Sequence, residues 1–365
     1  MKKNIYERNV GIDLLRILLM FMIVILHVVG HGGIIENVEI NSLNYYLIWL
    51  LEIICFVCVD CYAIISGYVG IDSKYKFSNI IILWLKVFLY SILLYLFVAG
   101  VLEKNFDFIT LIKNFFPVIM GNYWYFTSYF ILFLFMPFIN NFYDKISKRQ
   151  LNFVMLLLFL FMSIIPTLQA RDIFCTVNGY SSFWLIYLYL IGAFLKKNHL
   201  LSNKKINTNL LVFIYLFSVF ITFALKILFD KRILLPSLIL KDGGAFVNYT
   251  SPTVIISSIC LILLFTSIKF KNNFFKKTIQ IISPLTFSVY LISDNYYIRT
   301  YFINNKFIYA SNFSPAKIVL FVLSLSFLIF CICITIDYIR EYLFKKMKIH
   351  DKLKKIDCII LEEAK

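Results

Sequence analysis

The first hydrophobic stretch of the chain contains an arginine and a histidine eleven residues apart, Arg16 and His27. A charged side chain in the bilayer core costs about 2.5–3.5 kcal/mol on insertion scales, so such residues usually face protein or water and are usually functional. Eleven residues at about 100° each return to within about 20° of the same helix face, about 16 Å along the axis. Asp13 lies on a neighbouring line of that face, in position to hold the guanidinium. The pattern favours a helix that lines a polar cavity over a snorkelling arginine with a hydrogen-bonded buried histidine.

Further ionisable side chains lie within apolar stretches, among them Glu52, Asp60, Lys86 and Asp294. Asp60 and Asp294 are the stronger site candidates, because a short acid cannot reach the membrane surface from the interior. Lys86 has an equally good alternative, in which its long side chain extends to the inner surface. Trp124 opens a further apolar stretch, where aromatic anchors are expected at a membrane interface whatever the function.

The two histidines at an i, i+4 spacing, His27 and His31, raise the question of a metal site. They would share an ion only if both stood on one helix, and Gly30, Gly32 and Gly33 favour a helix end at this point. The sequence also shows neither the glycine patterns of nucleotide-binding loops nor a nucleophile elbow. We therefore predict neither a metal site nor a bound cofactor.

The composition predicts that these residues lie on membrane-spanning helices. Hydrophobic residues make up 61% of the 365 residues and charged residues only 15%, with a mean hydropathy of +0.83. Apolar stretches of about 20 residues, long enough to cross a bilayer as helices, recur between short polar segments. No loop is long enough to fold as a soluble catalytic domain. The sequence predicts an all-α polytopic membrane protein with about ten transmembrane helices, over residues 11–30, 45–67, 78–99, 123–141, 150–168, 181–195, 208–229, 252–268, 282–302 and 316–338.

Positive charge is distributed unequally over the segments between these spans. With ten spans, the side that holds both termini carries 24 Lys and Arg residues. The opposite side carries nine when Arg299 and Lys317, at the outer ends of the last two spans, are counted with it. Because Lys and Arg concentrate in cytoplasmic loops, both termini are predicted to be cytoplasmic, in a multi-pass protein of the cell (plasma) membrane. The net charge of +16 is then a topology signal aided by the lipid bilayer, and no nucleic-acid partner is expected. We divide the chain into a membrane domain, residues 1–340, and a basic cytoplasmic tail, residues 341–365.

Five segments, in order across nearly the whole chain, resemble one family, the integral-membrane acyltransferase-3 group that O-acylates bacterial surface carbohydrates. The first comprises residues 11–16 together with His27, and it resembles the signature of the family's first helix. Each of the five segments is weak alone, but the ordered set on ten spans is fairly specific. The other four are residues 59–68, 83–91, 123–140 and 282–295.

Two positions depart from the usual form of the last segment, which commonly reads TFGVYLIHDN in the family. Ser288 stands where glycine is usual, and Ser293 stands where histidine is often found. A catalytic role for that histidine would leave this chain weakened or altered in donor choice. A structural role would allow Ser293 to replace it as a hydrogen-bonding group, and the sequence leaves both interpretations open.

The resemblance implies a membrane O-acyltransferase, with acetyl as the expected group. It implies cytoplasmic acyl-CoA, most simply acetyl-CoA, as co-substrate and a hydroxyl of a cell-surface or cell-wall glycan as acceptor. His27, as base or acyl carrier, and Asp13 would then be catalytic, and Arg16 and Lys86 would bind the donor. Further candidate site residues in the resembling segments are Asp60, Ser66, Trp124, Tyr290, Ser293 and Asp294.

Two other classes of function stay open. A polysaccharide flippase or transporter would also have ten or more spans and buried charges. It would be expected to show broken helices in corresponding halves of the chain, which the sequence does not reveal. A pseudoenzyme that only binds glycan or CoA is the second alternative, and Ser293 favours it.

Overall fold

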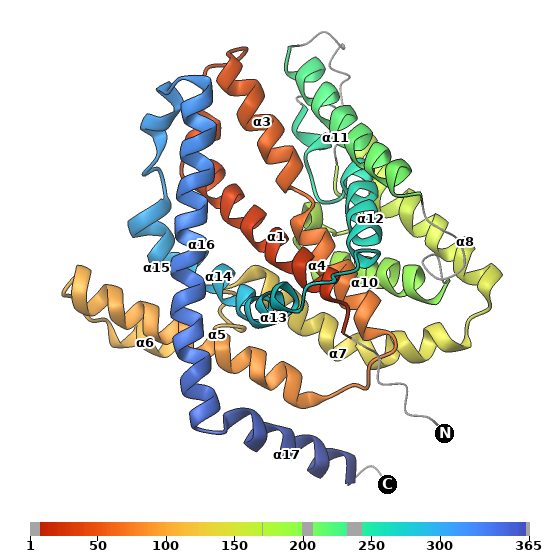
Figure 1. Cartoon of the computed structure of the whole chain (residues 1–365), viewed down its shortest axis with the longest axis vertical. Helices are drawn as coiled ribbons and strands as arrows, with labels where there is room; N and C mark the ends of the chain where they lie inside the picture. The colour runs from red at the N-terminus through yellow and green to blue at the C-terminus, as the bar shows by residue number, and fades with distance from the viewer. Residues whose placement is uncertain (1–7, 170, 199–206, 232–242, 363–365) are drawn as a thin grey trace.

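The computed structural model describes residues 8–169, 171–198, 207–231 and 243–362. These residues form helices joined by short loops and contain no β-strand, so the predicted all-α class is confirmed (Figure 1). In chain order the elements are α1 (Val10–Leu26), η1 (His27–His31), α2 (Ile34–Asn37), α3 (Leu43–Cys55), α4 (Cys58–Gly70), α5 (Phe77–Phe97), η2 (Val98–Leu102), α6 (Phe108–Asn114), α7 (Trp124–Lys145), α8 (Lys148–Phe159), η3 (Leu160–Ile164), α9 (Ile165–Gln169), η4 (Val177–Gly179), α10 (Ser182–Lys197), α11 (Thr208–Asp230), η5 (Gly243–Phe246), α12 (Pro252–Thr266), α13 (Asn273–Ile282), η6 (Ser283–Leu285), α14 (Thr286–Ser293), α15 (Tyr296–Ile298), η7 (Arg299–Ile303), η8 (Ile308–Asn312), α16 (Pro315–Lys346) and α17 (Ile349–Glu362).

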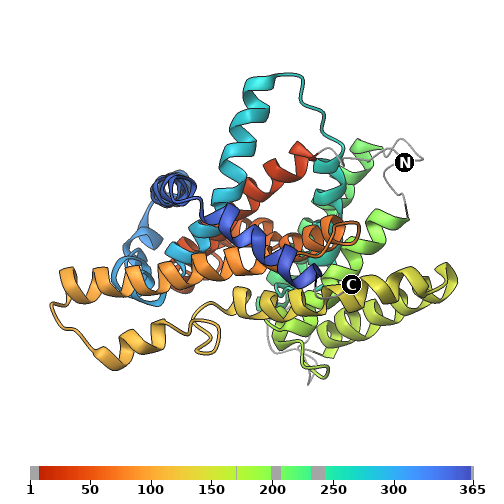
Figure 2. The same cartoon turned by 90° about the horizontal axis from the view of Figure 1, so that it is seen from below.

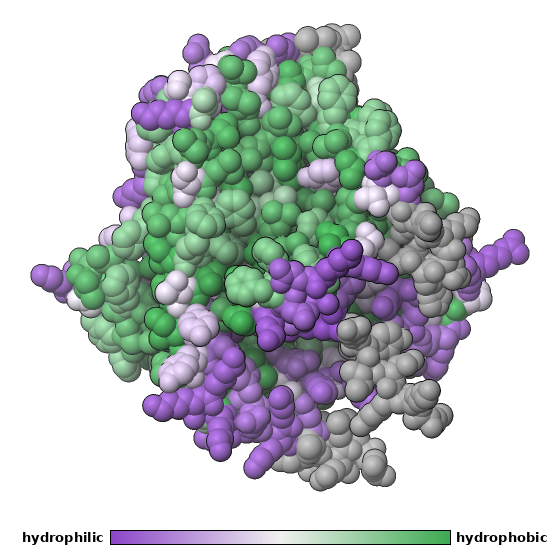
Figure 3. Space-filling view, viewed as in Figure 1, coloured by the Kyte–Doolittle hydropathy of each residue, from purple (hydrophilic) through white to green (hydrophobic). Residues whose placement is uncertain are grey.

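Seven helical stretches within the described residues are long and apolar enough, by length and composition, to cross a membrane. They coincide with seven of the ten predicted spans. Figure 3 shows apolar side chains over the middle and upper part of the face in view, with polar side chains gathered at the lower end. The fold is that of an all-α polytopic membrane protein. The seven stretches are Val10–His31, Leu43–Gly70, Phe77–Leu102, Trp124–Lys145, Lys148–Gln169, Thr208–Asp230 and Pro315–Lys346.

The other three predicted spans are shorter elements. α10 and α12 have 16 and 15 residues. The stretch predicted over residues 282–302 is not one helix, because α14 ends at Ser293 and the chain breaks at Asp294 and Asn295 before α15. The Asn295 side chain accepts hydrogen bonds from two backbone amides of α15. It is therefore the N-cap of this next short helix.

A second break interrupts the predicted span 45–67. α3 ends at Cys55 and α4 begins at Cys58, and the carbonyl oxygen of Val57 in the gap accepts a hydrogen bond from Ser258 at 3.3 Å. Neither break was predicted from the sequence. Both breaks lie beside the same cavity, which is described below, so irregular backbone occurs where it lines an internal space.

α1 runs through the middle of the bundle, and α4, α12, α14 and α16 pack around it (Figure 1). The side chain of Asn9 caps its first turn by accepting a hydrogen bond from the amide of Ile12. Gly11 permits the closest helix approach here, since a Cβ atom at this position would lie 1.8 Å from the carbonyl oxygen of Phe265. The helix that carries Arg16 and His27 is therefore held on several sides.

α4 and α10 cross at two glycines. A Cβ atom on Gly67 would lie 1.9 Å from the carbonyl oxygen of Tyr189, and one on Gly192 would lie 2.0 Å from that of Ile64. Small residues at such crossings let helix backbones pack closely in a membrane. The resulting contact buries Trp184 of α10, one of the largest side chains in the core.

The C-terminal segment that the sequence analysis separates as a basic tail, residues 341–365, is helical over most of its described length. α16 continues past the predicted end at residue 338 to Lys346, and the basic segment then folds as α17, which packs against α5 (Figure 2). The Asp357 carboxylate accepts hydrogen bonds from the backbone amide and the hydroxyl of Ser78, at 2.9 and 2.5 Å. α17 therefore caps the first turn of α5.

Candidate functional site

His27 stands where α1 passes into the π-helical turn η1. Its Nδ1 atom lies 3.1 Å from the hydroxyl oxygen of Ser293, the last residue of α14. The His27 side chain is 12% exposed, so the ring is largely shielded but still reachable. Because Ser293 fixes one ring nitrogen, the Nε2 atom is left as the site for chemistry or binding.

The carboxylate of Asp294, the residue directly after Ser293, lies close to three basic side chains. Its Oδ1 atom accepts a hydrogen bond from Arg299 at 2.9 Å and lies 3.7 Å from Nε2 of His31 and 4.0 Å from Nε2 of His27. The 4.0 Å separation is too long for a hydrogen bond, so Asp294 acts on His27 through its charge. The break after α14 brings this carboxylate to the histidines.

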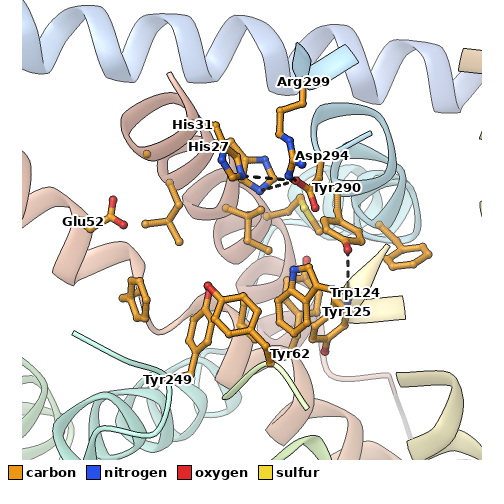
Figure 4. A pocket seen from close by; sticks show the side chains of 18 residues that line it. His27, His31, Glu52, Tyr62, Trp124, Tyr125, Tyr249, Tyr290, Asp294 and Arg299 are labelled. Carbon is orange, nitrogen blue, oxygen red and sulfur yellow. Dashed lines mark hydrogen bonds and ion pairs between the residues drawn. The ribbon is translucent and has the colours of Figure 1, made fainter. Parts of the chain in front are cut away.

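A cavity of about 330 Å³ opens beside this cluster (Figure 4). Helices α1, α3, α4, α7 and α14 contribute to its wall, together with the segments that hold Tyr180, Tyr249 and Arg299. The wall combines a few ionisable groups with many aromatic rings, the composition of a ligand site. The cavity is lined by Met20, Ile23, Leu26, His27, Gly30, His31, Glu52, Phe56, Val59, Tyr62, Trp124, Tyr125, Tyr180, Tyr249, Phe287, Tyr290, Asp294 and Arg299.

Two aromatic candidates from the sequence, Trp124 and Tyr290, lie in this wall. Tyr290 is one turn before Asp294 on α14, and its hydroxyl oxygen accepts a hydrogen bond from the Tyr125 amide at 3.3 Å. Trp124 packs against Tyr180 with ring centroids 4.5 Å apart. The structure thus brings these two candidates together with His27.

One ligand atom from each of His27, His31 and Asp294 lies within 4.8 Å of the others. Imidazole nitrogens and a carboxylate oxygen are zinc ligands in general. Here the carboxylate oxygen nearest the two rings is the one bound to Arg299, whose positive charge opposes a metal cation at the same point. The cluster therefore suits proton transfer or anion binding better than metal binding.

The expectation that glycines end the first helix before His31 is wrong. The helix passes through Gly30 as the π-helical turn and ends after His31, and Gly33 follows with a φ of 81°. Gly32 packs closely against a later segment of the same chain, because a Cβ atom there would lie 2.6 Å from the Phe307 ring. The π-turn keeps both histidines on the wall of the cavity.

Arg16 and Asp13 lie at the other end of α1, in the wall of a second cavity of about 290 Å³. Asp13 is buried and binds Arg8 Nε at 2.5 Å and Arg16 Nη1 at 3.3 Å, and it accepts a hydrogen bond from the hydroxyl of Ser283 at 3.1 Å. The predicted contact between Asp13 and Arg16 is confirmed. Asp13 and His27 are 14 residues apart on a helix, about 20 Å along the axis, so the two do not share a site.

Lys86 lines neither of these cavities. Its Nζ atom lies 3.4 Å from Asp337 and donates to the carbonyl oxygen of Pro284 at 3.1 Å. Asp337 also accepts two hydrogen bonds from Arg340, at 2.7 and 2.9 Å, and one from Tyr90 at 2.9 Å. Lys86 is thus part of a buried network that joins α5 to α16.

Asp60 and Ser66 of α4 also lie outside the lining of the two cavities. Asp60 is buried. One of its carboxylate oxygens accepts a hydrogen bond from the indole of Trp184 at 3.1 Å, and the other has no hydrogen-bond partner among the described residues. Ser66 donates to the carbonyl oxygen of Tyr62, one turn earlier, at 3.0 Å. Their contacts are those of helix packing.

Three acidic or basic residues of the site are not among the candidates drawn from the sequence: His31, Arg299 and Glu52. The sequence raises His31 only as a possible metal ligand, and Arg299 enters only the count of positive charges. A signal for Arg299 existed, because a cation five residues after Asp294 in an apolar stretch is a natural partner for it. Glu52 shared the signal of Asp60, an acid within a predicted span.

A family model described as an acyltransferase domain, of the acyltransferase-3 family, matches residues 9–338. The match covers every residue that lines the cavity around His27, together with most of α16. Comparison with curated proteins and comparison with solved structures both found no match. Because the matched region is most of the chain, the chain belongs to the acyltransferase-3 family.

Proposed function

We propose that this protein transfers an acyl group, most simply acetyl, from cytoplasmic acyl-CoA to a hydroxyl of a cell-surface or cell-wall glycan. The observation that carries the proposal is the setting of His27, with one ring nitrogen 3.1 Å from the hydroxyl of Ser293 and the ring in the wall of an aromatic cavity. Family membership supports acyl transfer as the reaction. The polar and aromatic wall supports an acceptor that carries both hydroxyls and apolar faces.

The step uses His27 as the base. With Nδ1 protonated and donating to Ser293, Nε2 takes the proton of the acceptor hydroxyl. The acceptor oxygen bonds to the thioester carbonyl carbon, and the carbon–sulfur bond then breaks. The imidazolium returns its proton to the leaving CoA sulfur, so the ring ends neutral. Asp294, 4.0 Å from Nε2, stabilises the imidazolium in between.

An acyl-carrier role for His27 uses the same geometry. In that route Nε2 itself bonds to the thioester carbonyl carbon, the carbon–sulfur bond breaks, and CoA leaves as the thiol with the proton that Nδ1 held. The acceptor oxygen then takes the acyl group from Nε2, and its hydroxyl proton returns to the ring. The two routes differ in whether a labelled acyl group stays on the protein after CoA has left. Acid quenching of the protein with labelled acetyl-CoA alone distinguishes them.

The second cavity is proposed to receive the polar part of the donor. Arg8, Arg16 and Lys196 lie in its wall, and an arginine fork suits the phosphates of CoA. Tyr62 lies between the two cavities, because it lines the first and donates a hydrogen bond to the carbonyl oxygen of Arg16 at 2.7 Å. A thin acyl–pantetheine arm would follow α1 past Tyr62 to His27, about 16 Å along the helix.

The test uses the purified protein in liposomes, with labelled acetyl-CoA inside and total cell-wall glycan outside. We expect label to appear on the glycan. Glycan that moves into the liposomes without acquiring label would instead support a transporter, a class for which the broken helices beside the cavity are also suited. Bound glycan with neither label nor movement would support a pseudoenzyme.

A further inference from the structure

Glu52 lines the cavity but takes no part in the acyl transfer described above. It reaches the cavity from α3, whereas Asp294 and Tyr290 reach it from α14 (Figure 4). Its Oε2 atom is buried and has no hydrogen-bond partner among the described residues. Burial of a carboxylate oxygen without a partner costs free energy, so an acid retained in such a place is by default a functional residue.

Cations near Glu52 are engaged by other acids. Lys226 of α11, the helix that packs on α3, binds Asp230 at 2.5 Å and lies 3.9 Å above the ring of Trp49. Arg299 on the far side binds Asp294. No ion pair between residues that the structure describes includes Glu52. Its hydrogen-bonding capacity is therefore available to a ligand.

An aromatic wall begins one turn after Glu52. Phe56 stacks on Tyr249 with ring centroids 4.5 Å apart and an interplanar angle of 24°. Tyr249 contacts Tyr180 at 5.1 Å, and Tyr180 contacts Trp124 at 4.5 Å. We call these four rings, Phe56, Trp124, Tyr180 and Tyr249, the aromatic wall. Together with Glu52 they present broad apolar faces beside one strong hydrogen-bond acceptor.

We propose that Glu52 and the aromatic wall form the acceptor subsite, and that they select a neutral, hydroxyl-rich sugar ring. The inference rests on the proposed transferase function and assigns its acceptor site. The aromatic wall packs on the apolar face of the sugar, and Glu52 accepts hydrogen bonds from its hydroxyls, which leaves another hydroxyl to face His27. A sugar that carries its own carboxylate finds no unpaired cation among the described residues in this part of the wall, because Arg299 is bound to Asp294.

The test compares Glu52→Ala and Glu52→Gln with the wild-type protein in the same liposomes. Total cell-wall glycan is the outside probe, and hydrolysis of acetyl-CoA without glycan is measured separately. Loss of the Glu52 carboxyl should raise the apparent KM for glycan by about tenfold in Glu52→Gln and by more in Glu52→Ala, which removes every hydrogen-bonding atom of the side chain. Acetyl-CoA hydrolysis and the KM for acetyl-CoA should stay unchanged. Glu39→Gln, an exposed acid that follows α2, is the matched control and should show no change.

A second variant tests the aromatic side of the subsite. Trp124→Leu should raise the KM for glycan as well, through loss of the ring face. An unchanged KM for glycan in both Glu52 variants, or a fall in kcat with unchanged KM, would overturn the subsite.

These outcomes are separate from a failure of the proposed function. The wild-type arm alone decides whether label reaches glycan, and the variant arms decide where the glycan binds. Wild-type protein that hydrolyses acetyl-CoA but never labels glycan would overturn both proposals. Wild-type labelling with normal kinetics in the variants would overturn only the role of Glu52. Each variant is first checked for wild-type elution and melting temperature in detergent, so that a misfolded protein is not scored.

Discussion

The Nδ1 atom of His27 lies 3.1 Å from the hydroxyl oxygen of Ser293, although 266 residues separate the two along the chain. The serine that stands where the family often has a histidine is thus the direct partner of the proposed catalytic ring. This geometry supports the interpretation of Ser293 as a hydrogen-bonding substitute. The hydrogen bond selects one tautomer of His27 and leaves Nε2 toward the cavity.

Removal of the Ser293 hydroxyl should slow catalysis without weakening binding. We expect Ser293→Ala to lower kcat about tenfold, the value of one orienting hydrogen bond, with the KM for both substrates unchanged. Ser293→Thr keeps the hydroxyl and should retain most of the activity. Steady-state kinetics in liposomes check this, and a wild-type kcat in Ser293→Ala would show that the contact does not orient His27.

Arg16 should act on the donor. Because an arginine fork binds phosphate in the ground state, Arg16→Ala should raise the apparent KM for acetyl-CoA about tenfold or more and change kcat less. Lysine supplies the charge without the fork, so Arg16→Lys should recover part of the affinity. If the dependence on acetyl-CoA is the same in Arg16→Ala as in wild type, Arg16 is only the structural partner of Asp13.

The buried network around Asp337 should stabilise the fold. Asp337→Asn leaves Lys86 and Arg340 without their shared acid, and loss of one partner of a buried pair costs about 3–5 kcal/mol. Lys86→Met should cost less, because Arg340 still neutralises Asp337. Thermal unfolding in detergent should rank wild type above Lys86→Met and Lys86→Met above Asp337→Asn. The reverse order of the two variants would contradict this account of the network.

Features within one helix were predictable from the sequence, because the helical period fixes which residues share a face. The contact between Asp13 and Arg16 and the place of His27 on the cavity-lining helix both follow from spacing alone. Seven spans were also found, since their apolar length is a local property.

Contacts between distant helices were not predictable. Nothing local to His27 specifies Ser293, and nothing local to Lys86 specifies Asp337. The break at Asp294 was hidden because its neighbours are apolar enough to resemble a continuous span, while the Asn295 side chain ends one helix and starts the next. Such breaks depend on tertiary partners that satisfy the freed backbone.

The orientation of the chain in the membrane can be tested without an activity assay. The 24 Lys and Arg residues on the side of the termini, against nine on the other, predict cytoplasmic termini. A reporter active only outside the cytoplasm should be silent when fused after Lys365 and active when inserted in the loop at Asn41. A C-terminal fusion with outside activity would require an odd number of spans and would overturn the placement of Arg16 at the cytoplasmic end.

The rate of glycan labelling by His27→Ala tests the central claim most directly. The substitution removes a polar group from a membrane helix, so the protein should insert and accumulate normally. We expect a loss of about 10²-fold or more, the scale of general acid–base catalysis, and nearly the same loss in His27→Gln, which cannot carry a proton at neutral pH. Glycan labelling by His27→Ala at close to the wild-type rate, at matched protein level, would contradict the mechanism and leave a binding or transport role.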